Sequence, residues 1–442
     1  MEELGYWGRA LRLIKSAGAS IYDRVRVRRG RLSLEGLLMP PADPSDDRFV
    51  VLKLDSGYNI GIRVDEGAAV ELLAKGSAHH PSLPEVAMEA RGELPRVSII
   101  STGGTIASRV DYVTGAVYPA LSARDLYNVV PELGEIANID AEVLMSILSE
   151  DMRPPLWTEI ARSVASKIES GVDGVVVTHG TDTMGYTAAA LSFALQDLPV
   201  PVVLVGSQRS SDRPSSDAAM NLMCAVTVAS RAPFAEVVVV MHGSVSDTYA
   251  LVHRGTRVRK CHTSRRDAFK SINCPPLAKV EGGKVELLSK PLRDRDRSRR
   301  VRLSANFEER VALVKAYPGM DGSLVDHLVS RGFRGLVLEG TGLGHVPHAI
   351  FDSLKRAIDS GLVVVMTSQC LWGRVNMNVY RTGVELLRMG VLPGGDMLPE
   401  VALVKLMWCL GQTKDAEEVK RLMLTNIAGE LQDRTQFSSY LG

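Results

Sequence analysis

Hydroxyl, carboxylate and glycine residues gather in two short segments that are far apart along the chain. The first is residues 102–105, Thr-Gly-Gly-Thr, and the second is residues 179–183, His-Gly-Thr-Asp-Thr. Glycine lets a backbone approach a small ligand closely and presents amides to a carboxylate or a developing oxyanion. A threonine hydroxyl is a weak nucleophile that needs a neighbouring base to accept its proton. The two segments therefore suggest nucleophilic catalysis on a small ligand, with the base still to be found.

A structural explanation of the second segment is equally open at this point. Residues 186–195 are rich in Ala and Leu and predict a helix directly after it. Short polar side chains commonly satisfy the free amides at the start of a helix. His179 is interpreted as a structural residue of the turn, because no step of the chemistry requires it.

The segments follow two predicted strands, and this determines where they lie in a fold. From residue 95 onwards, apolar strands, polar loops and helical runs alternate, which is typical of a doubly wound parallel α/β sheet. Strands are expected at 97–100, 172–178, 202–205 and 237–241, and helices at 157–168 and 216–229. Ligands bind outside the carboxyl ends of such strands. Both segments lie there.

The rest of the chain divides into further units. A second, smaller α/β unit is expected from strands at 311–315, 335–338 and 362–366 and helices at 323–330 and 348–358, with a last helix opening at Asp415. Residues 1–75 predict a small β-barrel-like module of four strands, at 23–28, 32–38, 49–54 and 59–64, with a hairpin turn at 55–57. The expected organisation is the module at 1–75, a linker at 76–95, a larger α/β domain at 96–288, a connection at 289–309 and a smaller α/β domain at 310–442.

The N-terminal module contains a basic run. Its members are Arg24, Arg26, Arg28, Arg29 and Arg31. The commoner use of such a run is a solvated hairpin edge that charge protects from aggregation. Contact with RNA or a partner is the alternative.

Composition excludes several classes of protein. Among 442 residues, 52 Lys and Arg face 51 Asp and Glu, so the net charge of +1 gives no domain-wide attraction to nucleic acid or anionic membrane. Five cysteines without paired spacing argue against a disulfide framework or a zinc site, and no metal site is expected. No signal peptide or membrane span is evident, so a soluble cytoplasmic protein is expected. Residues 340–344, Gly-Thr-Gly-Leu-Gly, lack the spacing of a dinucleotide loop.

A third segment completes a resemblance to a known family. Residues 257–260, Arg-Val-Arg-Lys, would by default be a solvated basic run. Together with residues 102–108 and 178–183, however, they resemble the bacterial-type L-asparaginase family over roughly residues 95–425. The resemblance implies Thr105 as the acylated nucleophile and a proton-handling cluster of Thr181, Asp182 and Lys260.

The same resemblance implies further site residues. Tyr112 corresponds to the mobile-loop tyrosine beside the nucleophile. Ser149 and Glu150 correspond to the substrate-holding segment, where many asparaginases carry Gln in place of Glu150. Gly104 and Gly180 complete the predicted substrate-binding residues by offering backbone amides.

The flanking regions narrow the resemblance to one branch. Residues 35–41 and 51–62 are similar to the N-terminal domain of the D subunits of archaeal glutamyl-tRNA(Gln) amidotransferases, and residues 368–380 and 396–400 are similar to the same subunits. This implies a glutaminase that passes ammonia to an E-type subunit, which binds the tRNA and uses ATP and magnesium. The resemblance further implies a homodimer within a heterotetramer and no cofactor on this chain.

Two other functions remain open from the sequence. A stand-alone asparaginase or glutaminase would use the N-terminal module only for oligomerisation. A non-catalytic scaffold would keep the fold and bind an amino acid. The intact set of Thr105, Thr181, Asp182 and Lys260 argues against the scaffold, and the module argues against the stand-alone enzyme.

Overall fold

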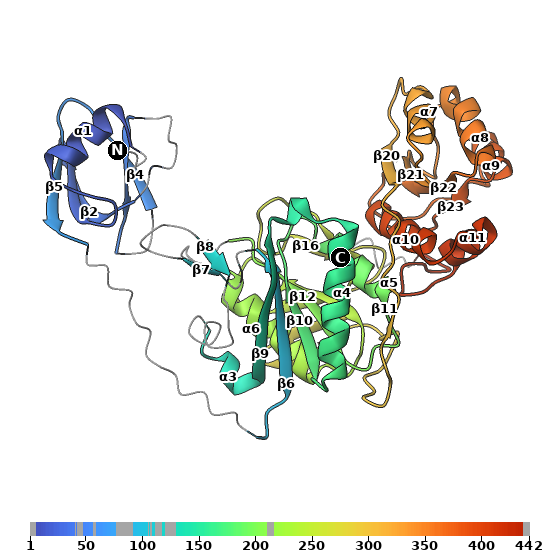
Figure 1. Cartoon of the computed structure of the whole chain (residues 1–442), viewed down its shortest axis with the longest axis horizontal. Helices are drawn as coiled ribbons and strands as arrows, with labels where there is room; N and C mark the ends of the chain where they lie inside the picture. The colour runs from blue at the N-terminus through green and yellow to red at the C-terminus, as the bar shows by residue number, and fades with distance from the viewer. Residues whose placement is uncertain are drawn as a thin grey trace.

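The structure of the chain is a computed structural model. It describes residues 6–39, 41, 47–55, 59–76, 92–104, 106, 108–110, 117–119, 130–209 and 216–435. A small N-terminal β module is followed by a larger and then a smaller α/β unit (Figure 1). The predicted fold class is thereby confirmed.

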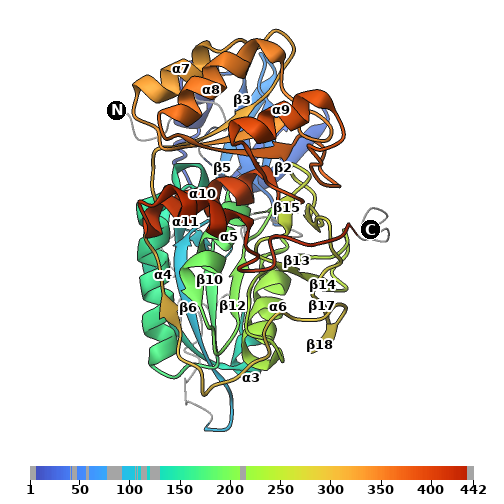
Figure 2. The same cartoon turned by 90° about the vertical axis from the view of Figure 1, so that its right-hand side faces the viewer.

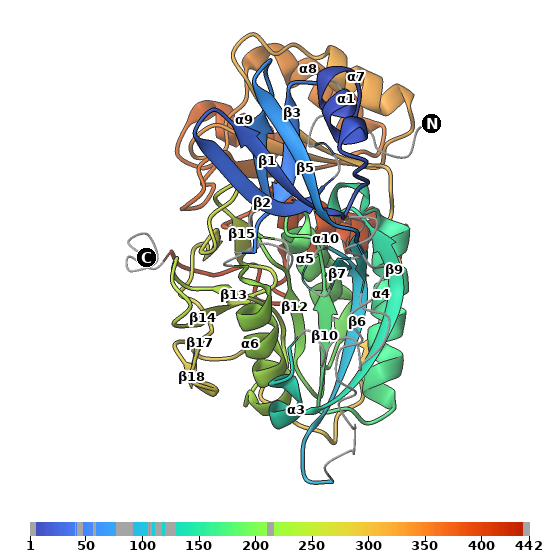
Figure 3. The ribbon, with the colours of Figure 1, turned by 90° about the vertical axis from the view of Figure 1, so that its left-hand side faces the viewer.

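The N-terminal module is a helix followed by an antiparallel sheet with the strand order β4-β3-β2-β1-β5 (Figure 3). Its elements are α1 (Gly8–Ser16), β1 (Arg24–Arg29), β2 (Leu32–Leu38), β3 (Phe49–Lys53), β4 (Asn59–Arg63) and β5 (Ala68–Ala74). The predicted hairpin is confirmed by the antiparallel pairing of β3 with β4. The fifth strand was not predicted because its sequence, Ala-Ala-Val-Glu-Leu-Leu-Ala, consists mainly of residues that favour helices, and pairing with β1 overrides that preference.

The basic run of the module is not a hairpin edge. β1 lies between β2 and β5, and acidic residues of neighbouring elements neutralise its arginines. The guanidinium of Arg26 contacts Glu35 of β2 at 2.5 Å and Glu71 of β5 at 3.0 Å. The other pairs are Arg24–Asp55, Arg28–Glu71 and Arg29–Asp65. The run is therefore solvated, as expected, but its position on an edge was wrong, because β1 lies between two strands and its arginines pair with acids of neighbouring segments.

The larger α/β unit is built on a sheet with the strand order β18-β17-β14-β13-β12-β10-β6-β9. Its strands are β6 (Arg96–Gly103), β9 (Asn138–Ile147), β10 (Gly174–Thr178), β12 (Val202–Val205), β13 (Val237–His242), β14 (Ala250–Arg254), β17 (Ala278–Glu281) and β18 (Lys284–Leu287). The strands from β9 to β13 are parallel, as predicted. β14, β17 and β18 extend the sheet antiparallel, which the alternation of strands and helices did not predict.

Helices cover both faces of this sheet (Figure 2). They are α3 (Leu133–Ile136), α4 (Pro154–Glu169), α5 (Met184–Ala194) and α6 (Ala218–Arg231), and a 3-10 turn, η1, spans Ser149–Asp151. Because successive strand residues point to opposite faces, Val175 and Val177 pack in one core with α4 and α5, and Val176 packs in the other with α3 and α6. The sheet edge that carries the polar loops is thus supported by packed helices on each side.

Short strand pairs lie outside the main sheet. They are β7 (Ser108–Val110) with β8 (Val117–Pro119), β11 (Leu195–Gln196) with β19 (Arg302–Leu303), and β15 (Val258–Lys260) with β16 (Phe269–Ser271). The third pair is the hairpin that carries Lys260, and we call residues 258–271 the Lys260 hairpin.

The smaller unit is a parallel sheet with the order β20-β21-β22-β23. Its elements are β20 (Val311–Lys315), α7 (Ser323–Ser330), β21 (Gly335–Gly340), η2 (His348–Ile350), α8 (Phe351–Asp359), β22 (Val363–Ser368), α9 (Arg381–Met389), β23 (Leu392–Pro393), α10 (Pro399–Gln412) and α11 (Ala416–Leu424). The predicted elements are present, and Asp415 caps α11 by accepting a hydrogen bond from the Glu417 amide at 3.0 Å.

One apolar core joins the two α/β units. Ala189, Ala190 and Phe193 of α5 pack in it with residues of α10, and the rings of Phe193 and Trp408 stack with centroids 6.0 Å apart. α5 is apolar all round because the main sheet covers one side of it and α10 the other. α5 therefore packs against both α/β units and forms part of the interface between them.

The connection between the units is bonded to the larger one. Arg295 donates hydrogen bonds to the carbonyls of Ser230 at 2.8 Å and Asp173 at 2.5 Å. Burial lowers the pKa of Arg295, and these carbonyls supply the acceptors that its guanidinium lost from water. The predicted connection is charged, but it is not loosely attached.

Candidate active site

Three loops meet at the carboxyl edge of the main sheet, after the neighbouring strands β10, β6 and β9. A Cβ added to Gly104, whose φ is +77°, would lie 2.9 Å from the Gly180 nitrogen. A Cβ on Gly180 would lie 2.7 Å from the Cβ of Ser149. Gly104, Gly180 and Ser149, which the sequence placed in one substrate site, are therefore in direct contact, and only glycine fits at the first two positions.

Lys260 contacts both polar side chains of the second loop. Its Nζ donates hydrogen bonds to Thr181 Oγ1 and Asp182 Oδ1, each at 2.8 Å. The Lys260 side chain is 15% exposed and that of Asp182 is 68% exposed, so the lysine is mostly covered while the carboxylate faces open solvent. The cluster predicted from segments 79 and 78 residues apart is present in the geometry.

The helix-capping explanation of the loop does not fit. The N-cap residue of α5 is Thr183, and its side chain makes no cap hydrogen bond. Its hydroxyl instead donates to the Ser149 carbonyl at 2.6 Å, which ties the second loop to the segment after β9. The side chains of Thr181, Asp182 and Thr183 thus bond to other segments of the chain, and none of these bonds caps the helix.

His179 is a buried structural residue, as the sequence interpretation had it. Its Nδ1 lies 2.7 Å from the Gly180 carbonyl, and its Nε2 lies 2.9 Å from Thr187 Oγ1, which also accepts from Trp157 Nε1. A carbonyl can only accept, so Nδ1 carries the proton and Nε2 accepts from Thr187. Burial lowers the pKa of His179 to about 4, which keeps the ring neutral.

The basic run before Lys260 is not solvated. Arg257 is fully buried, with Nη1 2.9 Å from Asp396 Oδ2 and Nε 2.7 Å from the Gly429 carbonyl. Arg259 lies 3.6 Å from Glu400, and burial raises the pKa of that carboxyl group. No local pattern reveals these partners, because Asp396 is 139 residues from Arg257.

Two predicted site residues lie outside the described residues. They are Thr105 and Tyr112. Glu150 is exposed on η1, directly after the buried Ser149.

The glycine-rich segment after β21 is not a nucleotide loop. The amides of Thr341, Gly344 and His345 are all bonded within the turn, to the carbonyls of Thr341 and His345. The next α-helix begins only at Phe351. A phosphate would therefore find no α-helix N-terminus directly after this segment.

Other kinds of site find no support in the described part of the chain. Within it, no group of three or more His, Cys, Asp and Glu side chains could hold a metal ion. None of the helices described is long and apolar enough to cross a membrane. All five cysteines are free.

Comparison with known proteins defines the class of the two α/β units. Residues 96–293 match the asparaginase N-terminal domain, and residues 310–423 match the glutaminase/asparaginase C-terminal domain. The L-asparaginase of Thermococcus kodakarensis superposes with a TM-score of 0.69 at 35% identity, covering 77% of this chain and all of that one. L-asparaginase I of Vibrio cholerae gives a TM-score of 0.67 at 32% identity, over 77% of this chain and 99% of that one. The two α/β units therefore have the asparaginase-type fold.

The N-terminal module shows to which branch of the asparaginase-like proteins the chain belongs. Residues 19–73 match the GatD N-terminal domain. The glutamyl-tRNA(Gln) amidotransferase D subunit of Metallosphaera sedula is 57% identical over 433 residues, 97% of each chain. The D subunit of Pyrococcus furiosus is 54% identical over 433 residues, 97% of this chain and 98% of that one. The chain therefore belongs to the family of glutamyl-tRNA(Gln) amidotransferase D subunits.

Proposed function

We propose that the chain is the glutaminase subunit of a tRNA-dependent amidotransferase in the cytoplasm. It hydrolyses glutamine and supplies the ammonia to an E-type partner, which converts Glu-tRNA(Gln) to Gln-tRNA(Gln). The names of the relatives above imply a partner and a tRNA, and the near-neutral charge of this chain suits a tRNA surface that lies mainly on the partner. ATP and magnesium belong to the partner's reaction, and the assembly would be a homodimer of this chain within a heterotetramer.

The proposed reaction begins at the loop after β6. Thr105 attacks the side-chain amide carbon of glutamine, and backbone amides of Gly104 and Gly180 stabilise the tetrahedral oxyanion. The Thr105 hydroxyl gives its proton to the Thr181–Lys260 pair, which passes it to the departing nitrogen. The C–N bond breaks, ammonia leaves, and an acyl ester on Thr105 remains. Water then cleaves the ester and releases glutamate.

The proton is handled by the second loop and the Lys260 hairpin. Thr181 Oγ1 and Lys260 Nζ are hydrogen-bonded at 2.8 Å, so a proton passes between them without rearrangement. Asp182 holds the other side of the ammonium and, with Glu150, faces the α-ammonium of the substrate. Ser149 and the loop amides receive the α-carboxylate, and Tyr112 assists the nucleophile.

The observation that carries this proposal is the Lys260 contact with Thr181 and Asp182 at the edge where Gly104 and Gly180 meet. A scaffold that only binds an amino acid would not need a lysine such as Lys260, whose side chain is mostly covered and whose Nζ is bonded to Thr181 and Asp182. The module at residues 19–73 favours the amidotransferase over a stand-alone asparaginase.

The test of the chemistry is ammonia release from glutamine. Thr105→Ala and Lys260→Ala are each expected to abolish it while the circular dichroism spectrum and the unfolding temperature stay near those of the wild type. Turnover like that of the wild type in either variant would contradict the assignment.

The test of the partner uses the same assay. The chain alone is expected to show weak glutaminase activity that rises sharply when the E-type subunit and Glu-tRNA(Gln) are both added. Full activity of the chain alone, unchanged by both additions, would favour the stand-alone enzyme.

A further inference from the structure

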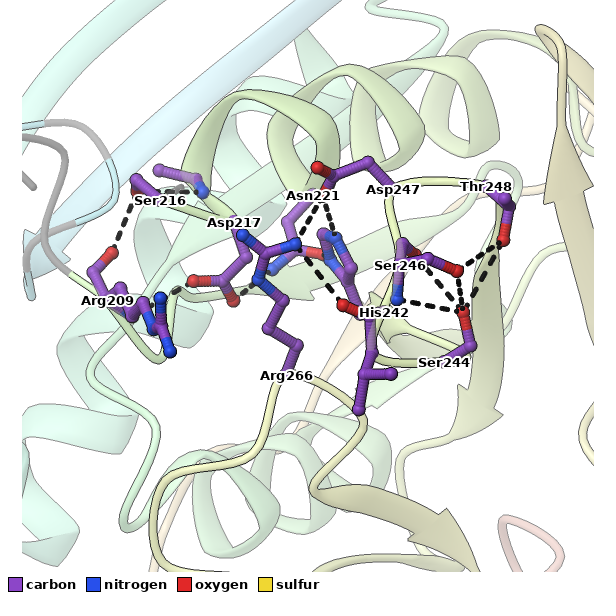
Figure 4. A network of polar contacts seen from close by, with 12 residues as sticks. Arg209, Ser216, Asp217, Asn221, His242, Ser244, Ser246, Asp247, Thr248 and Arg266 are labelled. Atoms are coloured by element: carbon purple, nitrogen blue, oxygen red, sulfur yellow. Dashed lines mark hydrogen bonds and ion pairs between the residues drawn. The ribbon is translucent and has the colours of Figure 1, made fainter. Parts of the chain in front are cut away.

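A polar network, which is buried at Asn221 and His242 and open to solvent at Asp247, lies beside the site and is used by none of the steps above. Figure 4 shows it around His242, whose side chain is fully buried at the end of β13. His242 Nδ1 lies 2.6 Å from Asn221 Oδ1, and Nε2 lies 2.8 Å from Asp247 Oδ1. Buried polar groups are costly unless every one is bonded, so a network of this kind fixes the geometry of the elements it joins.

On one side the network reaches Thr181. Asn221 Nδ2 donates to the Gly206 carbonyl at 3.0 Å. Gly206 packs so closely on the second loop that an added Cβ would lie 2.7 Å from the His179 carbonyl oxygen and 2.9 Å from the Thr181 methyl group. Asn221 therefore fixes the surface on which Thr181 rests.

On the other side the network reaches Lys260. Asp247 Oδ1 also accepts from Arg266 Nη1 at 2.9 Å. Arg266 belongs to the turn of the Lys260 hairpin, and its side chain is only 12% exposed. The hairpin lies outside the main sheet, so this contact holds its tip while Arg257 and Asp396 hold its base.

The contacts thus form a closed circuit. They run from Thr181 through Gly206, Asn221, His242, Asp247 and Arg266 to the hairpin, and Lys260 returns to Thr181 by its own hydrogen bond. A change at His242 would move the two proton-transfer partners relative to each other without touching either.

The orientation of the Asn221 amide is fixed. Asn221 Nδ2 also donates to Asp217 Oδ2 at 3.0 Å, so the amide oxygen must be the atom that faces His242. Both ring nitrogens of His242 are thus engaged, Nδ1 with this oxygen and Nε2 with the Asp247 carboxylate. Neither nitrogen is left for the exposed hydroxyls of Ser244 and Ser246, which excludes a second nucleophilic site built on this histidine.

We propose that Asn221, His242 and Asp247 are positioning residues of the glutaminase site, which hold the Lys260 hairpin at the distance from Thr181 that proton transfer requires. This inference rests on the proposed function. None of the three residues touches Lys260 or Thr181 directly. Their effect acts through Gly206 and Arg266.

The experiment compares three substitutions of His242 in the full chain, with and without the partner subunit. The glutamine amide places a nitrogen near the position of Nε2 and can still donate to Asp247, whereas the asparagine amide reaches only the position of Nδ1. His242→Leu removes both ring contacts and is expected to lower kcat for glutamine hydrolysis roughly 10- to 100-fold, because a displacement near 1 Å has that effect. KM is expected to stay within about twofold, and His242→Gln is expected to retain most of kcat while His242→Asn does not.

Thr227→Val is the matched control. Thr227 is buried on α6, as is Asn221, and its hydroxyl bonds only to the Met223 carbonyl within that helix. Thr227→Val is expected to shift the unfolding temperature, because one buried hydroxyl and its hydrogen bond are lost, and to leave kcat unchanged. Unfolding is measured for every variant, so that kcat is expressed per folded molecule.

Three results would overturn the inference. They are an unchanged kcat per folded molecule in His242→Leu, a rise in KM at constant kcat, and equal activity in His242→Gln and His242→Asn. Lys260→Ala is run beside them. If it is inactive while His242→Leu is not, the positioning role alone fails, and if it is active, the proposed function fails as well.

Discussion

Two runs of basic residues in this chain look alike in sequence and differ entirely in structure. The arginines of β1 stand on an exposed sheet face and pair with Glu35, Glu71 and other acids across the strands. The run at 257–260 is divided instead. Arg257 is buried between the two α/β units, and Lys260 reaches the candidate site.

The difference lies in the partners and not in the charges. In the N-terminal module each arginine of β1 meets an acid that remains in water, which contributes little to stability. In the second run one cation replaces its hydration with Asp396 and a backbone carbonyl, and another points a proton donor at a hydroxyl. Position therefore decides whether a basic residue only pairs at the surface, belongs to an interface or takes part in a reaction.

The largest effect is expected when the charge at residue 260 is kept and its proton chemistry is changed. Lys260→Arg keeps the cation, but guanidinium does not release a proton in proteins. Glutamine turnover is expected to fall by roughly 10²- to 10⁴-fold, the usual contribution of a positioned proton donor or acceptor. Arg26→Lys is the control, with turnover unchanged. An active Lys260→Arg enzyme would mean that Lys260 supplies only charge.

The next largest effect is on stability. Arg257→Met leaves Asp396 buried and unpaired, and the free energy of unfolding is expected to fall by about 3–5 kcal/mol. Adding Asp396→Leu should restore most of the loss, because two apolar side chains can replace a buried pair. Denaturant titration measures both. A single variant as stable as the wild type would show that the pair is not part of the interface energy.

His179 is a buried basic residue that carries no charge in the folded protein. The pKa of His179 is lowered to about 4 from its ordinary 6.5, so between those values the unfolded chain binds a proton that the folded chain does not. Stability is therefore expected to fall as the pH drops from 6.5 to 4, by up to about 3 kcal/mol from this residue. His179→Gln should flatten that pH dependence in denaturant titrations. A slope equal to that of the wild type would refute it.

The smallest effect is expected in the N-terminal module. Arg26→Met removes two exposed ion pairs. Its effect on stability should be smaller than those predicted for Arg257→Met and for the protonation of His179, and it should vanish at high salt, which screens exposed charges. An effect that persists at high salt would show that the ion pairs of Arg26 do not behave as exposed surface pairs.

Local patterns predicted much of this molecule. The smaller sheet, the helices on both faces of the larger one and the two polar loops followed from apolar periodicity, because neighbouring residues determine these features. Lys260 is different. Its segment looks like any basic run, and only its resemblance to a known family singled it out.

The missed features depend on contacts between distant residues. β5 has helix-favouring residues but pairs with β1, and Arg257 has a partner in the other α/β unit. Asn221 and His242 lie on a helix and a strand with no motif around them, and only the fold brings them to Gly206 and Arg266. A sequence pattern describes an element and its faces, but not which other element will cover them.

The position of α5 in the interface between the two α/β units limits where the chain can be truncated. Expressed without the smaller unit, the larger one would present Ala189, Ala190 and Phe193 to water and would be expected to self-associate. The N-terminal module has a core made only of its own residues, among them Ile14, Val25 and Leu52. Removal of the residues before 92 should thus leave a protein that does not self-associate, whereas removal of the residues after about 309 should produce one that does.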